Sequence, residues 1–139
     1  MAYQHSTRAV RVLRVYCPIA AETLVALATG QAAAIDRDAT LAAILGIVRG
    51  DNPLGDFAPY RSVVELAPGW ELFTPGADAR PALGEAGRAS ASPTAILTIY
   101  IPADAPEAAV SSAVDAIVAA HPWEVPVIEL TEARLVVRS

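Results

Sequence analysis

The residues best suited to chemistry lie in the tetrapeptide His121-Pro122-Trp123-Glu124. A histidine nitrogen and a carboxylate three residues on can both bind a metal ion or the polar part of a small molecule. His121 and Glu124 are therefore candidate metal ligands, and Trp123 is a candidate stacking surface. A zinc site needs three or four ligands, so this pair is incomplete. The alternative is structural: His121 at a helix end is favoured by the helix dipole, and Trp123 packs below a strand.

A second candidate site lies in the glycine-containing stretch that begins at Arg80. Gly84 and Gly87 flank Glu85-Ala86, and successive backbone N–H groups there could bind an anion, with Arg80 or Arg88 supplying positive charge. The simpler interpretation is a turn whose backbone requires a positive φ. Both interpretations stay open at this point.

No combination of residues predicts an enzyme. Ser90, Ser92, Asp78 and His121 are the residue types of a hydrolase triad, but no Gly-x-Ser-x-Gly turn surrounds either serine. All ten basic residues are arginine, which excludes lysine-dependent mechanisms. Cys17 follows an apolar strand pattern and is expected to be a small buried side chain rather than a nucleophile.

The overall composition restricts the partners. The chain has 139 residues, 54% of them hydrophobic, and a formal charge of -5. An acidic chain is a poor nucleic-acid binder, because phosphates require a basic surface. No stretch has the roughly 20 apolar residues of a membrane span, and no signal peptide is visible. We therefore expect no nucleic acid and no membrane as partners, and a cytoplasmic protein with one unpaired cysteine.

The hydrophobic periodicity predicts alternating strands and helices. The predicted strands are Val10 to Tyr16, Arg61 to Leu66, Ala95 to Ile101 and Val125 to Leu130, with a short edge strand from Leu135 to Val137. The predicted helices are Glu22 to Ala34, a second that is capped by Asp38 or Thr40 and runs to Arg49, and a third that is capped by Asp104 and ends near Ala120.

Two of these helices carry an apolar stripe at helical spacing. The second has Leu41, Ile44, Leu45 and Val48, and the third has Val110, Val114, Ile117 and Val118. Pro68-Gly69 predicts a turn, and it opens a connection over residues 67–94 that is unusually long for a compact domain. Residues 1–9 are expected to be an N-terminal tail and residues 10–139 a single domain.

This order of elements predicts an α+β fold. Two interleaved β-α-β units form a ferredoxin-like βαββαβ sandwich, with an antiparallel sheet and helices on one face. An extra helical segment is expected near residues 20–38.

Three stretches resemble a known group of proteins. Ala79-Arg80-Pro81-Ala82-Leu83-Gly84-Glu85-Ala86-Gly87 is similar to the Ala-Asn-Pro-Phe-Ile-Gly-x-x-Gly segment of the PII-like domain inserted in NIF-like dinuclear-metal proteins. Phe73-Thr74-Pro75 resembles the Phe-Arg-Pro of that family, and residues 121–124 resemble its His-Pro-Tyr-Glu, which CutA proteins share. Arg80 and Ala82 depart from the pattern. The dinuclear metal site of those proteins belongs to a different domain, so we do not expect that activity from this sequence.

The resemblance implies a PII-like or CutA-like module that assembles as a homotrimer. Ligands would lie in clefts between subunits, and the loop over residues 67–94 would reach a protein partner. The predicted function is a small oligomeric binding or regulatory module that holds a divalent metal ion or a nucleotide. Its candidate site residues are His121, Trp123, Glu124, Arg80, Gly84 and Gly87. The alternative is a purely structural oligomerisation domain without a ligand.

Overall fold

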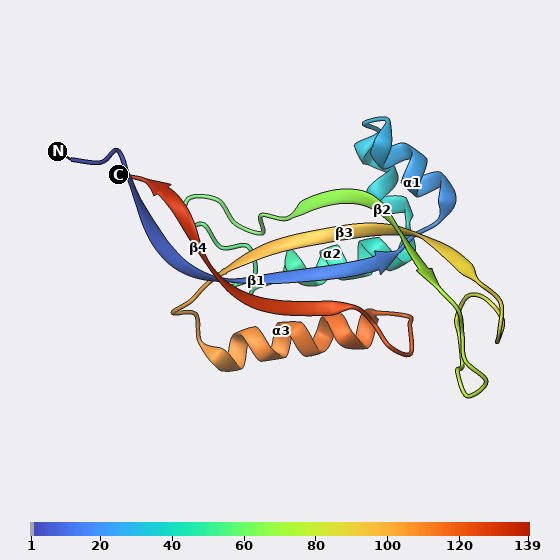
Figure 1. The fold of residues 1–139 in the computed structure, drawn as a ribbon. Coiled ribbons are helices and arrows are strands. Elements are labelled where there is room, and N and C mark those ends of the chain that lie inside the picture. The colour runs from blue at the N-terminus through green and yellow to red at the C-terminus, as the bar shows by residue number, and fades with distance from the viewer. Residues whose placement is uncertain (1) are drawn as a thin grey trace.

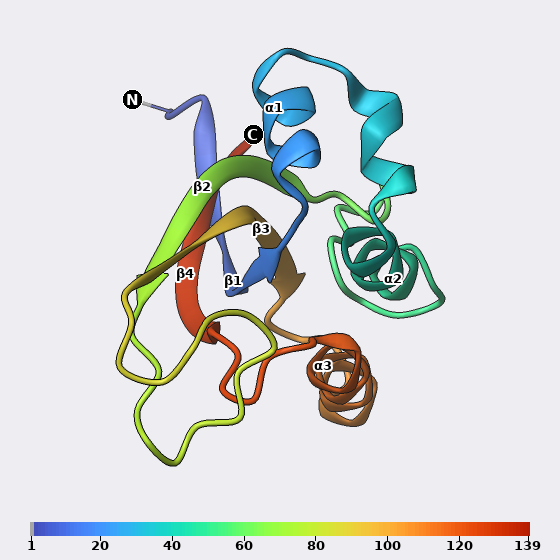
Figure 2. The same ribbon diagram turned by 90° about the vertical axis from the view of Figure 1, so that its right-hand side faces the viewer.

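The computed structural model describes residues 2–139 as a four-stranded antiparallel sheet with helices against one face (Figures 1 and 2). The strand order is β2-β3-β1-β4, the arrangement of two interleaved β-α-β units. The predicted ferredoxin-like α+β fold is confirmed. The elements are β1 His5–Pro18, α1 Ala21–Ala28, η1 Ala32–Arg37, α2 Ala39–Val48, β2 Glu65–Phe73, β3 Ser90–Pro102, α3 Glu107–Ala120 and β4 Ile128–Arg138.

The hydrophobic core lies between the sheet and helices α2 and α3. The apolar stripe predicted for α2 is confirmed, because its four side chains are at most 1% exposed. In α3 the buried residues are Val110, Ala113 and Ile117, whereas Val118 is 47% exposed. The predicted burial of Val118 is wrong because Ile117 already faces the sheet, and the next residue is rotated about 100° around the helix. The central strands β1 and β3 complete the core with alternate side chains.

Strand β2 lies later in the sequence than predicted. The structure forms no strand over residues 61–64, and Pro68-Gly69, predicted as a turn, lies inside β2 opposite Ala95 and Thr94. Pro68 is tolerated because β2 is an edge strand, where a missing N–H need not interrupt the sheet. A Cβ on residue 69 would lie 3.1 Å from Cδ1 of Ile96, so glycine permits this close approach. The connection predicted over residues 67–94 is therefore shorter, and spans residues 74–89.

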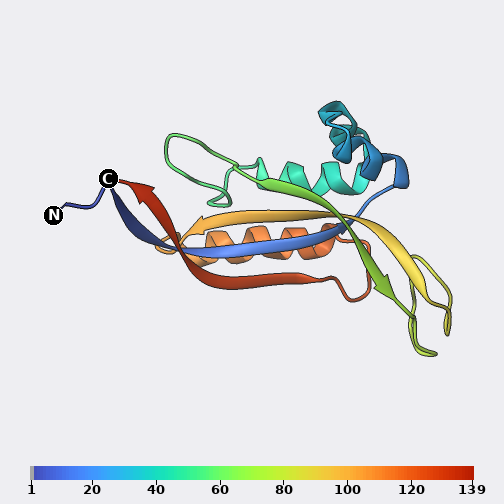
Figure 3. The same cartoon turned by 45° about the horizontal axis from the view of Figure 1, so that its top comes forward.

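Both terminal strands are longer than predicted. β1 begins at His5, which pairs with Arg138, so residues 5–9 are part of the sheet rather than of a tail. The two strands predicted near the carboxyl end are one continuous strand, β4. The reason is that β1 is 14 residues long and offers β4 a partner along its whole length. Figure 3 shows the two strands running together beyond the end of the helices.

The extra helical segment is present, but it is divided. α1 ends at Ala28 rather than at Ala34, and Gly30 has a φ of 79° that no helix continues through. The short 3-10 helix η1 then leads to α2. The segment lies at the end of the sheet where β1 finishes (Figures 1 and 3). Within residues 2–139 no helix is long and apolar enough to cross a membrane.

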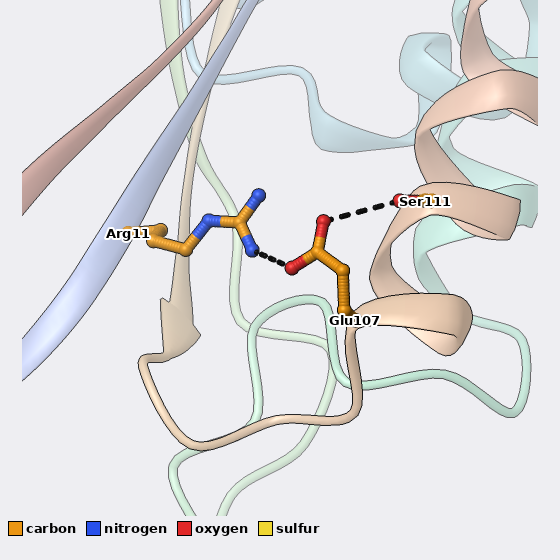
Figure 4. Close-up of polar contacts among 3 residues, drawn as sticks. All are labelled: Arg11, Glu107 and Ser111. Atoms are coloured by element: carbon orange, nitrogen blue, oxygen red, sulfur yellow. Dashed lines mark hydrogen bonds and ion pairs between the residues drawn. The ribbon is translucent and has the colours of Figure 1, made fainter.

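Helix α3 begins with an ion pair rather than with the predicted Asp104 cap. The residue before its first turn is Pro106, whose side chain makes no capping bond. Arg11 of β1 instead donates to Glu107 over 2.6 Å, and the Ser111 hydroxyl donates to the same carboxylate over 3.2 Å (Figure 4). These contacts attach the start of α3 to the sheet. The Arg11 guanidinium, followed by Ser111, holds the pKa of Glu107 below its ordinary value.

Glu107→Gln is expected to lower the melting temperature slightly at neutral pH, because exposed ion pairs contribute little. A carboxylate with a lowered folded-state pKa stabilises the fold above its unfolded pKa, and this contribution is lost as the pH falls through the folded-state pKa. The difference between wild type and variant should therefore vanish in acid. Melting curves over a pH series measure it, and a difference that persists in acid would contradict this account.

Candidate functional site

His121 occupies the turn after α3, and both of its ring nitrogens are engaged by the protein. Nε2 lies 2.8 Å from the carbonyl oxygen of Tyr16, and Nδ1 accepts the backbone N–H of Trp123 over 3.2 Å. Since Nδ1 is an acceptor, the proton resides on Nε2, which donates to Tyr16. The side chain is 7% exposed. His121 thus ties the end of α3 to the end of β1, which supports its structural interpretation.

Trp123 joins the same turn to the ribbon formed by β2 and β3. Its ring lies 4.9 Å from the Phe73 ring at an interplanar angle of 61°, and 6.3 Å from the His121 ring. These are favourable edge-to-face geometries. Phe73 and Trp123 belong to separate sequence motifs, and their rings are in contact in the structure.

Glu124 and Arg80 also meet, through the backbone. Oε1 of Glu124 accepts the N–H of Arg80 over 3.0 Å, and the Arg80 residue is otherwise exposed. This bond fixes the 74–89 connection to the turn after α3. The packing of Trp123 on Phe73 and the hydrogen bond from Arg80 to Glu124 therefore position the 74–89 connection against the turn after α3.

Gly84 and Gly87 are needed for the path of that loop. Their φ angles are 89° and 78°, in the region that favours glycine. A Cβ on Gly84 would lie 2.5 Å from the Ser90 hydroxyl oxygen, and the Gly87 N–H donates to the Pro75 carbonyl over 2.8 Å. Arg88 forms an ion pair with Glu85 at 3.7 Å. The turn interpretation accounts for both glycines, and the anion site stays a prediction.

The candidate metal ligands are not assembled into a centre within this chain. Across residues 2–139 no three His, Cys, Asp or Glu side chains are grouped so as to hold a metal ion. The polar atoms of His121, and one carboxylate oxygen of Glu124, are already bonded to protein groups.

A hollow of about 970 Å³ lies at the end of the molecule, beside the turn just described. We call it the end pocket. One wall is the segment from Ile19 to Thr40, the opposite wall is the tip of the 74–89 loop at Ala82 and Leu83, and the start of β3 and Trp123 lie between them. Of the residues singled out from the sequence as site candidates, only Trp123 lines it.

Asp38 organises the wall of the end pocket. Oδ2 accepts the N–H of Ala20 over 2.9 Å and the hydroxyl of Thr23 over 2.8 Å, and Oδ1 accepts the N–H of Leu41 over 3.1 Å. The predicted cap on α2 is confirmed, and the same carboxylate also fixes the first turn of α1. Sequence reasoning identified the cap but not the second role, since the partners at 20 and 23 are distant in the chain.

Cys17, the residue before the lining residue Pro18, is fully buried. Burial, assisted by the carboxylates of Asp38 and Glu71, raises the pKa of the Cys17 thiol to about 12. Thiolate is the reactive form, so the folded protein should not react with a thiol reagent at neutral pH, whereas the urea-unfolded chain should react with one equivalent. Rapid labelling of the native protein, at the rate of a free thiol, would contradict the placement of Cys17.

Comparison with known proteins shows the fold but no family. No family model and no curated protein matches the chain. A solved structure, the Bacillus cereus protein related to NIF3, is similar over 92% of this chain, with a TM-score of 0.58 and 16% sequence identity. The matched region is 26% of that protein, so this chain spans about a quarter of its length. The likeness agrees with the resemblance inferred from the motifs, and it establishes a shared ferredoxin-like architecture.

Proposed function

We propose that the chain is a small binding or regulatory module that takes a small-molecule ligand in the end pocket. One observation carries the proposal. The two segments that go beyond a minimal ferredoxin-like fold, residues 19–38 and the 74–89 connection, border the same hollow, and Trp123 lies between them. A volume of about 970 Å³ lies within the range of small-molecule sites.

The lining indicates the chemistry of the ligand. Apolar contact is available from Ile19, Leu83, Pro93 and Trp123. The charged lining residues are Arg37, Glu22 and Asp38, and the Asp38 carboxylate already accepts three hydrogen bonds from the chain. Apolar walls with a few polar groups are typical of sites for small organic molecules. A compound with a planar body fits best, and an anionic group on it, as in a nucleotide or an aromatic carboxylic acid, would have to pair with Arg37 of the lining. A divalent ion would need donors from the ligand or from a second copy.

The module is further proposed to be oligomeric. The resemblance to PII-like and CutA-like proteins implies three copies around a three-fold axis. In such an assembly the end pocket, which is open to one side, would be completed by a neighbouring subunit.

The test uses the intrinsic fluorescence of Trp123. The chain has two tryptophans, so Trp70→Phe leaves Trp123 as the reporter. This variant is titrated with nucleotides, with small aromatic carboxylic acids and with divalent ions, alongside thermal-shift measurements. We expect at least one compound to change the emission and to raise the melting temperature, as binding to the native state must.

A matched pair of variants locates the site. Leu83→Glu introduces a charge into the lining, whereas Leu72→Glu places it at a side chain that is 77% exposed and outside the end pocket. Binding should be lost in the first variant and kept in the second. Equal effects, or no response to any compound, would overturn the proposal.

A second candidate function is a purely structural oligomerisation domain. Several apolar side chains near the carboxyl end are exposed, namely Val125 at 77%, Val127 at 45%, Leu130 at 41% and Val136 at 71%. Such exposure favours a contact with another chain. This function predicts a stable assembly in which none of the compounds shifts the melting temperature.

A further inference from the structure

The carboxyl-terminal strand β4 is a long, uncovered edge of the sheet. It has 11 residues and pairs with β1 on one side only. The Ser139 N–H donates to Gln4, and the Val127 carbonyl accepts from Tyr16. Because hydrogen bonds alternate along an antiparallel pair, the odd-numbered residues of β4 bond to β1. The even-numbered residues therefore direct their N–H and C=O groups to the free edge.

The even-numbered residues of β4, whose backbone groups point to the free edge, are called the outward-bonding residues. Their side chains are complementary to a second, antiparallel copy of the same strand. Leu130 and Val136 are exposed apolar residues, and Glu132 and Arg134 are exposed charged residues between them. Among the described residues neither charge belongs to an ion pair, although Arg134 donates to the Thr7 hydroxyl. An uncovered strand of this length is a template for another strand.

We propose that β4 pairs antiparallel with β4 of a second copy of this chain, about a two-fold axis at Ala133. In this register Glu132 lies opposite the partner's Arg134, and Leu130 lies opposite the partner's Val136. By symmetry each of these contacts occurs twice. Directly opposite residues of an antiparallel pair have their side chains in contact, so both combinations stabilise the dimer.

Chain length and charge select the same register, and hydrogen bonding is compatible with it. An axis at Ala133, the middle residue of Ile128–Arg138, is the one that lets the two strands overlap along their full length. It also keeps outward-bonding residues opposite one another. Moving the axis by one residue would place two copies of Glu132, or two copies of Arg134, face to face, and like charges in that position are destabilising.

The inference is independent of ligand binding, and it requires an even number of copies in the assembly. A two-fold contact gives two copies, or six if a three-fold contact also forms. Three copies alone would contradict it. A monomer, with β4 left free for a strand of another protein, would contradict it as well.

Charge reversal tests the register directly. Glu132→Arg and Arg134→Glu each place like charges opposite one another, and both residues are exposed, so the fold should be kept. The dissociation constant of the β4 contact, measured by sedimentation equilibrium, should rise about tenfold or more in each single variant. The double variant restores opposite charges and should recover most of the wild-type constant.

Glu65→Arg is the matched control, since this exposed residue lies on β2 at the opposite edge of the sheet. It should leave the constant unchanged. Circular dichroism of each variant verifies folding. Unaltered dissociation in both single variants, or failure of the double variant to recover, would overturn the proposal.

Discussion

Asp38→Ala is expected to lower the free energy of unfolding by about 2–4 kcal/mol, because it removes the cap of α2 and an anchor of α1 together. Asp38 is only 9% exposed, and its carboxylate accepts three hydrogen bonds from Ala20, Thr23 and Leu41. Losing it would leave the buried hydroxyl of Thr23, which is 4% exposed, without that partner. The segment that forms one wall of the end pocket should loosen at the same time.

Urea unfolding monitored by circular dichroism measures this effect. Asp36→Ala is the control, because Asp36 lies two residues away and makes only an exposed ion pair with Arg49 at 3.3 Å. The control should change stability by less than about 1 kcal/mol. If the two variants are equally stable, Asp38 does not hold the two helices together as the contacts indicate.

Gly55→Ala is expected to cost about 3 kcal/mol or more, from backbone strain and from a steric clash. Gly55 has a φ of 70°, and a Cβ there would lie 2.4 Å from the carbonyl oxygen of Val63. Its own N–H donates to Tyr100 over 3.0 Å, and its carbonyl accepts from Val63. The residue thus fastens the connection between α2 and β2 to the sheet, and any side chain would push that connection away.

Gly30→Ala separates the two causes. Its φ of 79° is similar, but a Cβ at this position meets nothing within 4 Å. The free energy of unfolding of this variant should fall only by the cost of backbone strain, about 1–2 kcal/mol. Thermal and urea unfolding of the two variants provides the comparison, and equal losses would show that the contact with Val63 is relieved without cost.

The sequence predicted the fold because its core signals are local and consistent. The stripe in α2, the Asp38 cap and the apolar alternation of β1 and β3 are all confirmed. The position of β2 was missed because Pro68 and Gly69 are turn residues by propensity. Only their place on an edge strand, with Ile96 close by, makes them compatible with a sheet.

The site was harder to predict than the fold. His121 and Glu124 have side chains that can bind a metal ion, yet both are hydrogen-bonded to backbone groups of the chain itself. The walls of the end pocket come from residues 19–40 and 82–83, which form no recognisable sequence motif and meet only in three dimensions. The long connection was the one usable signal, since such loops are often functional.

The most direct test of the binding proposal is to map a bound compound by NMR. The chain, labelled with ¹⁵N, is titrated with the nucleotide or aromatic carboxylic acid that raises the melting temperature most. The binding proposal predicts that amide shifts concentrate at residues 19–23, 37–40, 82–83, 91–92 and 123, which line the end pocket. Shifts centred on another surface, with these amides unmoved, would contradict it.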